Sequence, residues 1–316
     1  MPNTITEPGG AAPRAGGGPF GEEDAAARRA AEEEASLFSH APVAPDATFA
    51  YGPHPDQVID FHAPRRDGGA TRPAPVVVVL HGGAWRAPYD RRHVGPFAAF
   101  LAGRGFAVAN VEYRRGRAAG ASGSGAGAAV AGRWPDTLDD VAAALDALPA
   151  LVHEELPEAD PHRVVVTGHS AGGHLALWGA ARHVLPVGDP RRSARPAPLR
   201  GVVALAPIAD LAVAAESGVC GGAVREFLGG DDAFAARRAH ADPALLLPTG
   251  IATALVHGRA DREVPGAVAE AYARAAAEAG EVVGVTLLEG VGHYALVDPA
   301  TDACAVVAEE IAQLAW

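Results

Sequence analysis

A serine in a glycine-rich turn, between a predicted strand and a predicted helix, constrains the fold of this chain most strongly. Residues 164–173 are VVVTGHSAGG, and the apolar helical pattern HLALWGAA follows directly. Gly168 and Gly172 lie two positions on either side of Ser170, and without a Cβ atom they allow the helix to approach the strand closely. The pattern predicts a strand, a sharp turn with Ser170 exposed at its apex, and a helix. An ordinary glycine-rich turn without chemistry is the alternative.

Short apolar runs alternate with helical patterns along the rest of the chain. Runs such as VVVVL at 76–80 are too short for a helix and predict strands buried on both faces. Residues 48–63 form two short alternating runs, as a hairpin at a sheet edge would. This order predicts an α/β fold with a mostly parallel central sheet of about eight strands and helices on both faces. The further predicted strands are 106–112, 202–206, 251–256 and 282–288, and the predicted helices are 89–103, 134–148, 264–280 and 299–314.

The composition along the chain divides it into three segments. Residues 1–21, rich in Gly, Pro and Ala, predict a disordered arm, and residues 22–47 predict a helix at 22–38, which we expect near the mouth of a site, with a linker. Residues 48–316 predict one large domain, the candidate catalytic domain. Within it, residues 212–248 lack a strong period, and we expect them to flank a pocket or to pack over the end of the sheet.

Composition and charge argue against several classes of protein. A net charge of −12 disfavours a nucleic-acid partner. Neither a secretory signal pattern nor a membrane-spanning apolar run is visible, so we expect a cytoplasmic protein without a membrane partner. The two cysteines, Cys220 and Cys304, lack metal-ligand spacing, and we expect neither a metal nor an organic cofactor. A bridge between them and assembly into a homodimer are left open.

A serine hydroxyl needs a base and an orienting acid to act as a nucleophile at neutral pH. Asp261 and His293 each follow a predicted strand, where the loops of a parallel sheet carry ligand-binding groups. The order serine, acid, histidine is that of the α/β-hydrolase fold. We therefore predict Ser170, Asp261 and His293 as catalytic residues. Asp210 also follows a strand and is the main rival acid, ahead of the pair at 231–232, although a helix-cap role explains it.

The segment HGGAW at 81–85 predicts a loop that stabilises a developing oxyanion. Its glycines let backbone N–H groups approach a substrate oxygen. We assign these donors to Gly83, Ala84 and Ala171, the last being the residue after the candidate nucleophile. Trp85 and Tyr294 are predicted to line the substrate pocket. We expect structural roles for the four residues His81, His169, His174 and Trp178.

Four segments together resemble the α/β-hydrolase superfamily. They are HGGAW at 81–85, GHSAGGHLA at 168–176, HGRADREVP at 257–265 and GVGHYALVDP at 290–299. The resemblance covers about residues 48–316 and is closest to the HGGxW branch, which holds small carboxylesterases and kynurenine formamidase-like enzymes. Ala84 stands where a related branch has a third glycine, which leaves the backbone donors in place.

These residues predict a serine hydrolase that cleaves a carboxylic ester of a small molecule through an acyl-enzyme. The resemblance to the HGGxW branch makes arylformamidase, which hydrolyses N-formylkynurenine, the alternative reaction. A hydrolase-fold binding protein without catalysis is the alternative from another class. The predicted partner is a small-molecule ester or amide.

Overall fold

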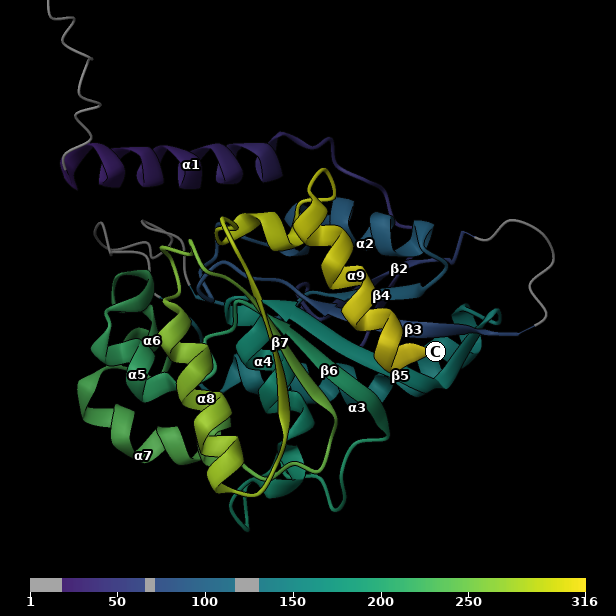
Figure 1. Ribbon diagram of the computed structural model, residues 1–316. Helices are drawn as coiled ribbons and strands as arrows, with labels where there is room; N and C mark the ends of the chain where they lie inside the picture. Colours follow the sequence, from purple (N-terminus) through teal and green to yellow (C-terminus); the bar gives the residue numbers. More distant parts are fainter. Residues whose placement is uncertain (1–18, 66–71, 117–130) are drawn as a thin grey trace, which may run out of the picture.

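The computed structural model describes residues 19–65, 72–116 and 131–316, and eight of its strands form one sheet in the order β1-β2-β4-β3-β5-β6-β7-β8 (Figure 1). The hairpin strands pair antiparallel, β2 pairs antiparallel with β4, and all other neighbours are parallel. The predicted α/β fold and hairpin are confirmed. The strands are β1 (Ala47–Ala50), β2 (Val58–His62), β3 (Ala74–Leu80), β4 (Ala107–Val111), β5 (Ala159–His169), β6 (Leu199–Leu205), β7 (Thr253–Gly258) and β8 (Val283–Leu288).

Helices cover both faces of the sheet (Figure 1). The α-helices are α1 (Pro19–Ser39), α2 (Gly95–Gly103), α3 (Asp136–Glu155), α4 (Ala171–Ala180), α5 (Leu211–Glu216), α6 (Ala223–Phe227), α7 (Asp231–Ala241), α8 (Gly266–Glu278) and α9 (Asp302–Ala315). Helices α2 and α9 pack on one face, and α3, α4 and α8 pack on the other. In β3, Val77 and Val79 face the first group, while Val76 and Val78 face the second. A strand buried on both faces therefore needs a continuous apolar run.

The register of the parallel strands brings several loops to one edge of the sheet. Leu80 of β3 is level with Gly168 of β5, and Gly258 of β7 is level with Leu288 of β8. The chain segments that begin at 81, 170, 259 and 289 therefore leave the sheet at the same end. This arrangement can gather side chains that lie far apart in the sequence.

The backbone of the serine turn packs directly on the backbone at the end of β3. A Cβ atom on Gly172 would lie 2.0 Å from the Leu80 carbonyl oxygen and 2.4 Å from that of His81. A Cβ atom on Gly168 would lie 2.3 Å from the Gly172 carbonyl oxygen. The two glycines on either side of the serine are thus required by contact between main chains, as the sequence pattern predicted.

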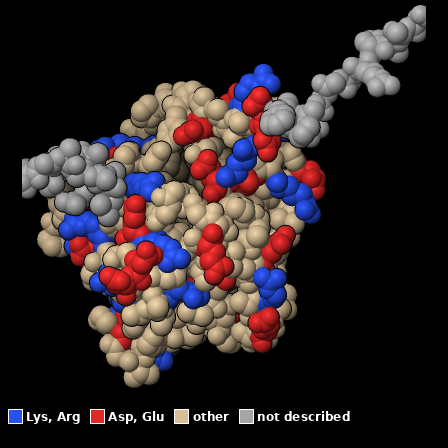
Figure 2. Space-filling model, turned by 90° about the vertical axis from the view of Figure 1, so that its left-hand side faces the viewer, with Lys and Arg blue, Asp and Glu red and all other residues tan. Residues whose placement is uncertain are grey.

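The remaining helical segments agree with the sequence predictions only in part. Helix α3 continues through Pro149 to Glu155, seven residues beyond its predicted end. Residues 212–248 form short helices, and α1 covers the segment predicted as a helix at 22–38. Of the predicted disordered arm at 1–21, residues 19–21 are the first residues of α1 and residues 1–18 lie outside the described residues. The division into three segments stays a prediction. On the face drawn in Figure 2, acidic and basic side chains are interspersed.

Replacing Gly172 with Ala should destabilise the fold, because the new methyl group meets carbonyl oxygens that cannot move independently. We expect a loss of about 1–3 kcal/mol in the free energy of unfolding, measured by urea denaturation. Gly103→Ala in α2 is the matched control, since nothing lies within 4 Å of the added Cβ. It should be neutral or stabilising by up to about 1 kcal/mol. Equal unfolding midpoints for the two variants would contradict the close packing of the turn.

Candidate active site

Ser170 lies at the apex of a strained turn between β5 and α4. Its backbone has φ 57° and ψ −116°, a conformation that is costly for a residue with a Cβ atom. The turn is held by a hydrogen bond from Ser170 N to Leu205 O of β6, at 2.8 Å. The residue is 3% exposed and lines a cavity of about 480 Å³. The surrounding strands thus hold the hydroxyl at the edge of an open cavity.

Asp261 and His293 form a hydrogen-bonded pair at the same edge of the sheet. His293 Nδ1 lies 2.7 Å from Asp261 Oδ2, and the Asp261 side chain is 1% exposed. The other carboxylate oxygen accepts hydrogen bonds from the backbone N–H groups of Glu263 and Val264, at 2.8 and 2.9 Å. The acid is therefore fixed by its own loop, and it can orient the imidazole and stabilise its protonated form.

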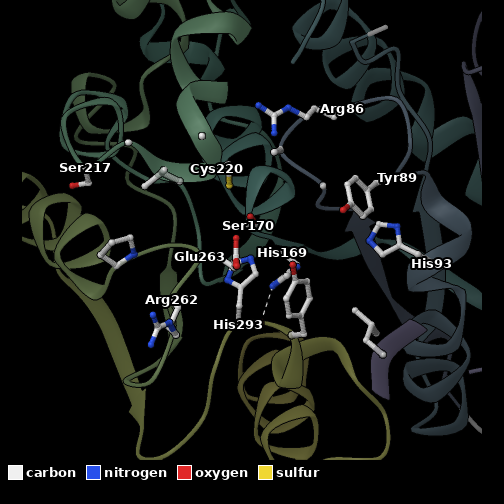
Figure 3. A pocket seen from close by; sticks show the side chains of 18 of the residues that line it. Arg86, Tyr89, His93, His169, Ser170, Ser217, Cys220, Arg262, Glu263 and His293 are labelled. Carbon is white, nitrogen blue, oxygen red and sulfur yellow. Dashed lines mark hydrogen bonds between the residues drawn. The ribbon is translucent and has the colours of Figure 1, made fainter. Parts of the chain in front are cut away.

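A second histidine holds the backbone of His293. His169 Nε2 donates to the His293 carbonyl oxygen at 2.9 Å, and the two rings lie 4.3 Å apart (Figure 3). Burial and the neighbouring His293 hold the pKa of His169 well below its usual value. His169 therefore stays neutral and serves as a structural donor, which agrees with its predicted role.

Ser170 and His293 line the same cavity and appear together at its centre in Figure 3. Among the described residues, no hydrogen bond joins the Ser170 hydroxyl to the His293 imidazole. Hydrogen bonds between a nucleophile and its base are frequently long until substrate binds. The catalytic pairing of these two residues is therefore part of the proposal below.

The predicted oxyanion loop lies against the serine turn. A Cβ atom on Gly82 would lie 2.9 Å from the His169 carbonyl oxygen and 3.4 Å from Ser170 Cβ. Gly83 and Ala84 line the cavity, while Ala171 is the first residue of α4, where N–H groups lack intrahelical partners. Within the described ranges, none of these three N–H groups donates a hydrogen bond to the protein. The N–H groups of Gly83 and Ala84, which line the cavity, are available to a ligand, and that of Ala171 belongs to the residue next to Ser170.

A buried ionic network anchors this loop from behind. His81 Nε2 lies 2.9 Å from Glu112 Oε1, and the His81 ring stacks on Tyr113 at 4.3 Å. Glu112 also contacts Arg115 and accepts a hydrogen bond from Arg91 N. Burial alone would raise the pKa of Glu112, but His81, Arg115 and the Arg91 N–H lower it to about 2. Sequence reasoning gave Glu112 no role, because the contact pairs two separate strand ends.

The two residues predicted to line the pocket differ in their position in the structure. Tyr294 lines the cavity, where the sequence analysis placed it. The prediction for Trp85 is wrong, because its side chain is fully buried and stacks on Phe227 of α6, with ring centroids 4.4 Å apart. Ala84 and Trp85 both have positive φ, 51° and 54°. These two left-handed residues reverse the chain and direct the indole into the core.

Other residues line the cavity that the sequence analysis did not select. Phe38 from the end of α1, together with Tyr89 and His93, forms an aromatic wall. Burial and the neighbouring His81 lower the pKa of His93 to about 4, so this imidazole is uncharged at neutral pH. The relevant signal in the sequence was the apolar pair Leu37 and Phe38 at the end of the predicted helix.

A thiol also lies in the cavity, on the segment 212–248 that was predicted to flank a pocket. Cys220 lines the wall within η3 (Val219–Gly222), and both it and Cys304 are free thiols. Burial and the nearby Glu263 raise the pKa of Cys220 to about 11. Because the thiolate is the reactive form, Cys220 is a weak rival to Ser170 as a nucleophile.

Several polar residues have the structural roles that the sequence predicted. Asp210 caps α5 by accepting from Ala212 N and Val213 N at 2.9 and 3.0 Å, so its carboxylate is engaged away from His293. His174 and Trp178 are fully buried and donate to backbone carbonyl oxygens.

In the described part of the chain, no three His, Cys, Asp or Glu side chains cluster as metal ligands would. No helix there is long and apolar enough to span a membrane.

A family model named BD-FAE matches residues 59–275, more than half of the 316-residue chain. The chain belongs to the BD-FAE family of α/β-hydrolases. The match includes Ser170 and Asp261 but ends before His293, and it begins after α1. The N-terminal helix and the histidine loop thus lie outside the matched range.

The chain is also similar to known hydrolases over part of their length. It is 32% identical over 127 residues to the probable carboxylic ester hydrolase LipM of Mycobacterium tuberculosis, covering 40% of this chain and 25% of LipM. It is 33% identical over 113 residues to dipeptidyl aminopeptidase BIII of Pseudoxanthomonas mexicana, covering 36% of this chain and 15% of that enzyme. The matches thus span a quarter or less of these relatives. Esterase B of Lactobacillus rhamnosis shares the fold, with a TM-score of 0.66 and 19% identity over 92% of both chains.

Replacing Glu112 with Gln should remove a pH-dependent part of the stability. The pKa of Glu112 in the folded protein, about 2, lies below its ordinary value of 4.5. Its stabilisation is therefore complete above about pH 4.5 and is lost as the pH falls toward 2. We expect the difference in unfolding free energy between wild type and Glu112→Gln to be largest near pH 6 and to shrink below pH 4 in urea titrations. A difference that is constant from pH 6 to pH 3 would contradict the anchoring role.

Proposed function

We propose that this protein is a serine hydrolase that cleaves carboxylic esters of small molecules through an acyl-enzyme. The observation that carries the proposal is the 2.7 Å hydrogen bond between the buried Asp261 and His293, which lines the same cavity as Ser170. Membership of the BD-FAE family and similarity to carboxylic ester hydrolases support it.

In the proposed reaction, Ser170 attacks the ester carbonyl carbon while His293 takes the hydroxyl proton. Asp261 keeps Nδ1 of His293 protonated, so that Nε2 is the base, and stabilises the imidazolium that forms. His293 then gives the proton to the leaving alcohol. Water, activated by the same histidine, releases the acid and restores Ser170.

The negative charge that develops on the carbonyl oxygen requires donors that are already in position. The unpaired N–H groups of Gly83, Ala84 and Ala171 supply them, because they lie on the two backbones that converge at Ser170. One such donor is worth about 3–4 kcal/mol in measured cases. The network of Glu112 and His81 keeps one of these backbones fixed, so the donors need little reorganisation during the reaction.

The cavity is large enough for a small-molecule ester. Its volume of about 480 Å³ and its wall of Phe38, Tyr89 and Tyr294 suit a small molecule with apolar parts. Arylformamidase remains the alternative reaction. A homodimer and a cytoplasmic location stay predictions from the sequence.

Ser170→Ala should lower kcat for a p-nitrophenyl ester by at least about 10⁴-fold, because the nucleophile is lost. A fluorophosphonate probe should add one label to the wild type, seen by intact mass, and none to the variant. A folded wild type that neither hydrolyses the ester nor takes the label would support the non-catalytic binding protein instead.

Asp261→Asn should lower kcat by about 10³–10⁴-fold, because the amide favours the wrong tautomer of His293. Asp210→Asn is the matched control, since asparagine is an equally good helix cap, and it should keep wild-type activity. Steady-state kinetics on one ester compare the two variants. Equal losses would overturn the assignment of the acid.

Rates on formyl, acetyl and butyryl esters of one alcohol separate the two reactions. The proposed carboxylesterase should accept acetyl and butyryl groups, whereas formyl transfer needs an acyl pocket that is closed almost to the carbonyl. The measurement is kcat/KM for each ester under the same conditions. A fall of more than about tenfold from formyl to acetyl, beyond the ester's intrinsic reactivity, would favour the formamidase reaction.

A further inference from the structure

The last two turns of α1 contact the chain segment that carries His293. The contacting residues recur at the spacing i, i+3, i+4 and i+7, which is that of one helix face. The first three, Glu33, Ser36 and Leu37, belong to α1, and His40 follows directly after its end. Leu37 is 3% exposed and packs in the core cluster that includes Leu296. In Figure 1, α1 lies across one end of the molecule.

Two polar side chains next to Leu37 and at the end of α1 form hydrogen bonds to Asp298, beyond η5 in the histidine segment. The Ser36 hydroxyl donates to Asp298 Oδ2 at 2.6 Å, and His40 Nε2 lies 2.7 Å from Asp298 Oδ1. The Asp298 side chain is 1% exposed. These contacts, with the burial of Leu37, fix the helix against η5 (Tyr294–Val297), which begins at the residue after His293.

Glu33 holds the near end of the same segment. Its Oε1 accepts a hydrogen bond from the backbone N–H of Gly292 at 2.8 Å. A Cβ atom on Gly292 would lie 2.3 Å from Glu33 Oε2, so the carboxylate lies directly over this glycine. Gly292 is buried, and without Glu33 its N–H group would lose its partner at a cost in free energy.

We propose that Glu33 is a positioning residue for His293. This proposal rests on the function proposed above. Three contacts then define the place of the base: Asp261 at its ring nitrogen, His169 at its carbonyl oxygen, and Glu33 at the amide one residue before it. The first comes from the loop after β7 and the second from the last residue of β5. The third comes from a helix that the family match does not cover.

Glu33→Ala tests this role. Loss of the contact should let the histidine loop shift, and a misplaced base lowers the rate of the chemical step more than substrate binding. We expect kcat for a p-nitrophenyl ester to fall on the order of tenfold, with KM nearly unchanged. Glu33→Gln should restore most of kcat, because its amide oxygen can accept the same hydrogen bond. Glu32→Ala, on the exposed side of the same helix, is the matched control and should behave as wild type.

Hydrogen exchange provides a measurement that does not depend on activity. The peptide containing Gly292 should exchange faster in Glu33→Ala than in wild type, while peptides from β5 and β6 stay unchanged. Wild-type kcat in Glu33→Ala, or an equal loss in Glu33→Gln, would overturn the positioning role. Absence of ester hydrolysis by the wild type would instead overturn the proposed function, and with it this inference.

Discussion

The contact between the backbone of the serine turn and the backbone at the end of β3 underlies the arrangement of this site. It leaves no space for a side chain at Gly172, whose Cα faces the carbonyl oxygens of Leu80 and His81. The contact joins the turn that carries Ser170 to the loop that carries Gly83 and Ala84. Because main-chain atoms set the spacing, the nucleophile and two of the proposed donors are placed without the help of flexible side chains.

The other components of the site are held by buried polar contacts around this backbone junction. Asp261 is held by two backbone N–H groups of its own loop, and Glu112 ties His81 to the strand next to β3. Such groups are costly to bury unless every partner is present. Buried hydrogen bonds therefore hold the groups that would stabilise charge in the proposed reaction, whereas Phe38 of the aromatic wall belongs to a separate helix.

The sequence predicted the fold well because its signals are local. An apolar run such as 76–80 shows by its length that it is a buried strand, and Gly168 and Gly172 mark a turn whose geometry depends on nearest neighbours. The candidate triad could be chosen because each of its members follows a strand that the sequence predicts. The direction of Trp85 could not be predicted, since it depends on two left-handed backbone residues. The contact of Glu33 with Gly292 could not be predicted either, because nothing in either segment indicates the other.

The distance along the chain between α1 and the histidine loop has a consequence for biosynthesis. Glu33 and Gly292 are separated by 259 positions, and chains are made from the N-terminus, with early segments folding first. A growing chain thus contains the strained serine turn well before it contains the base and the last helix. In this protein α1 cannot contact Gly292 until that segment has been synthesised, so the proposed site is completed late in the growth of the chain.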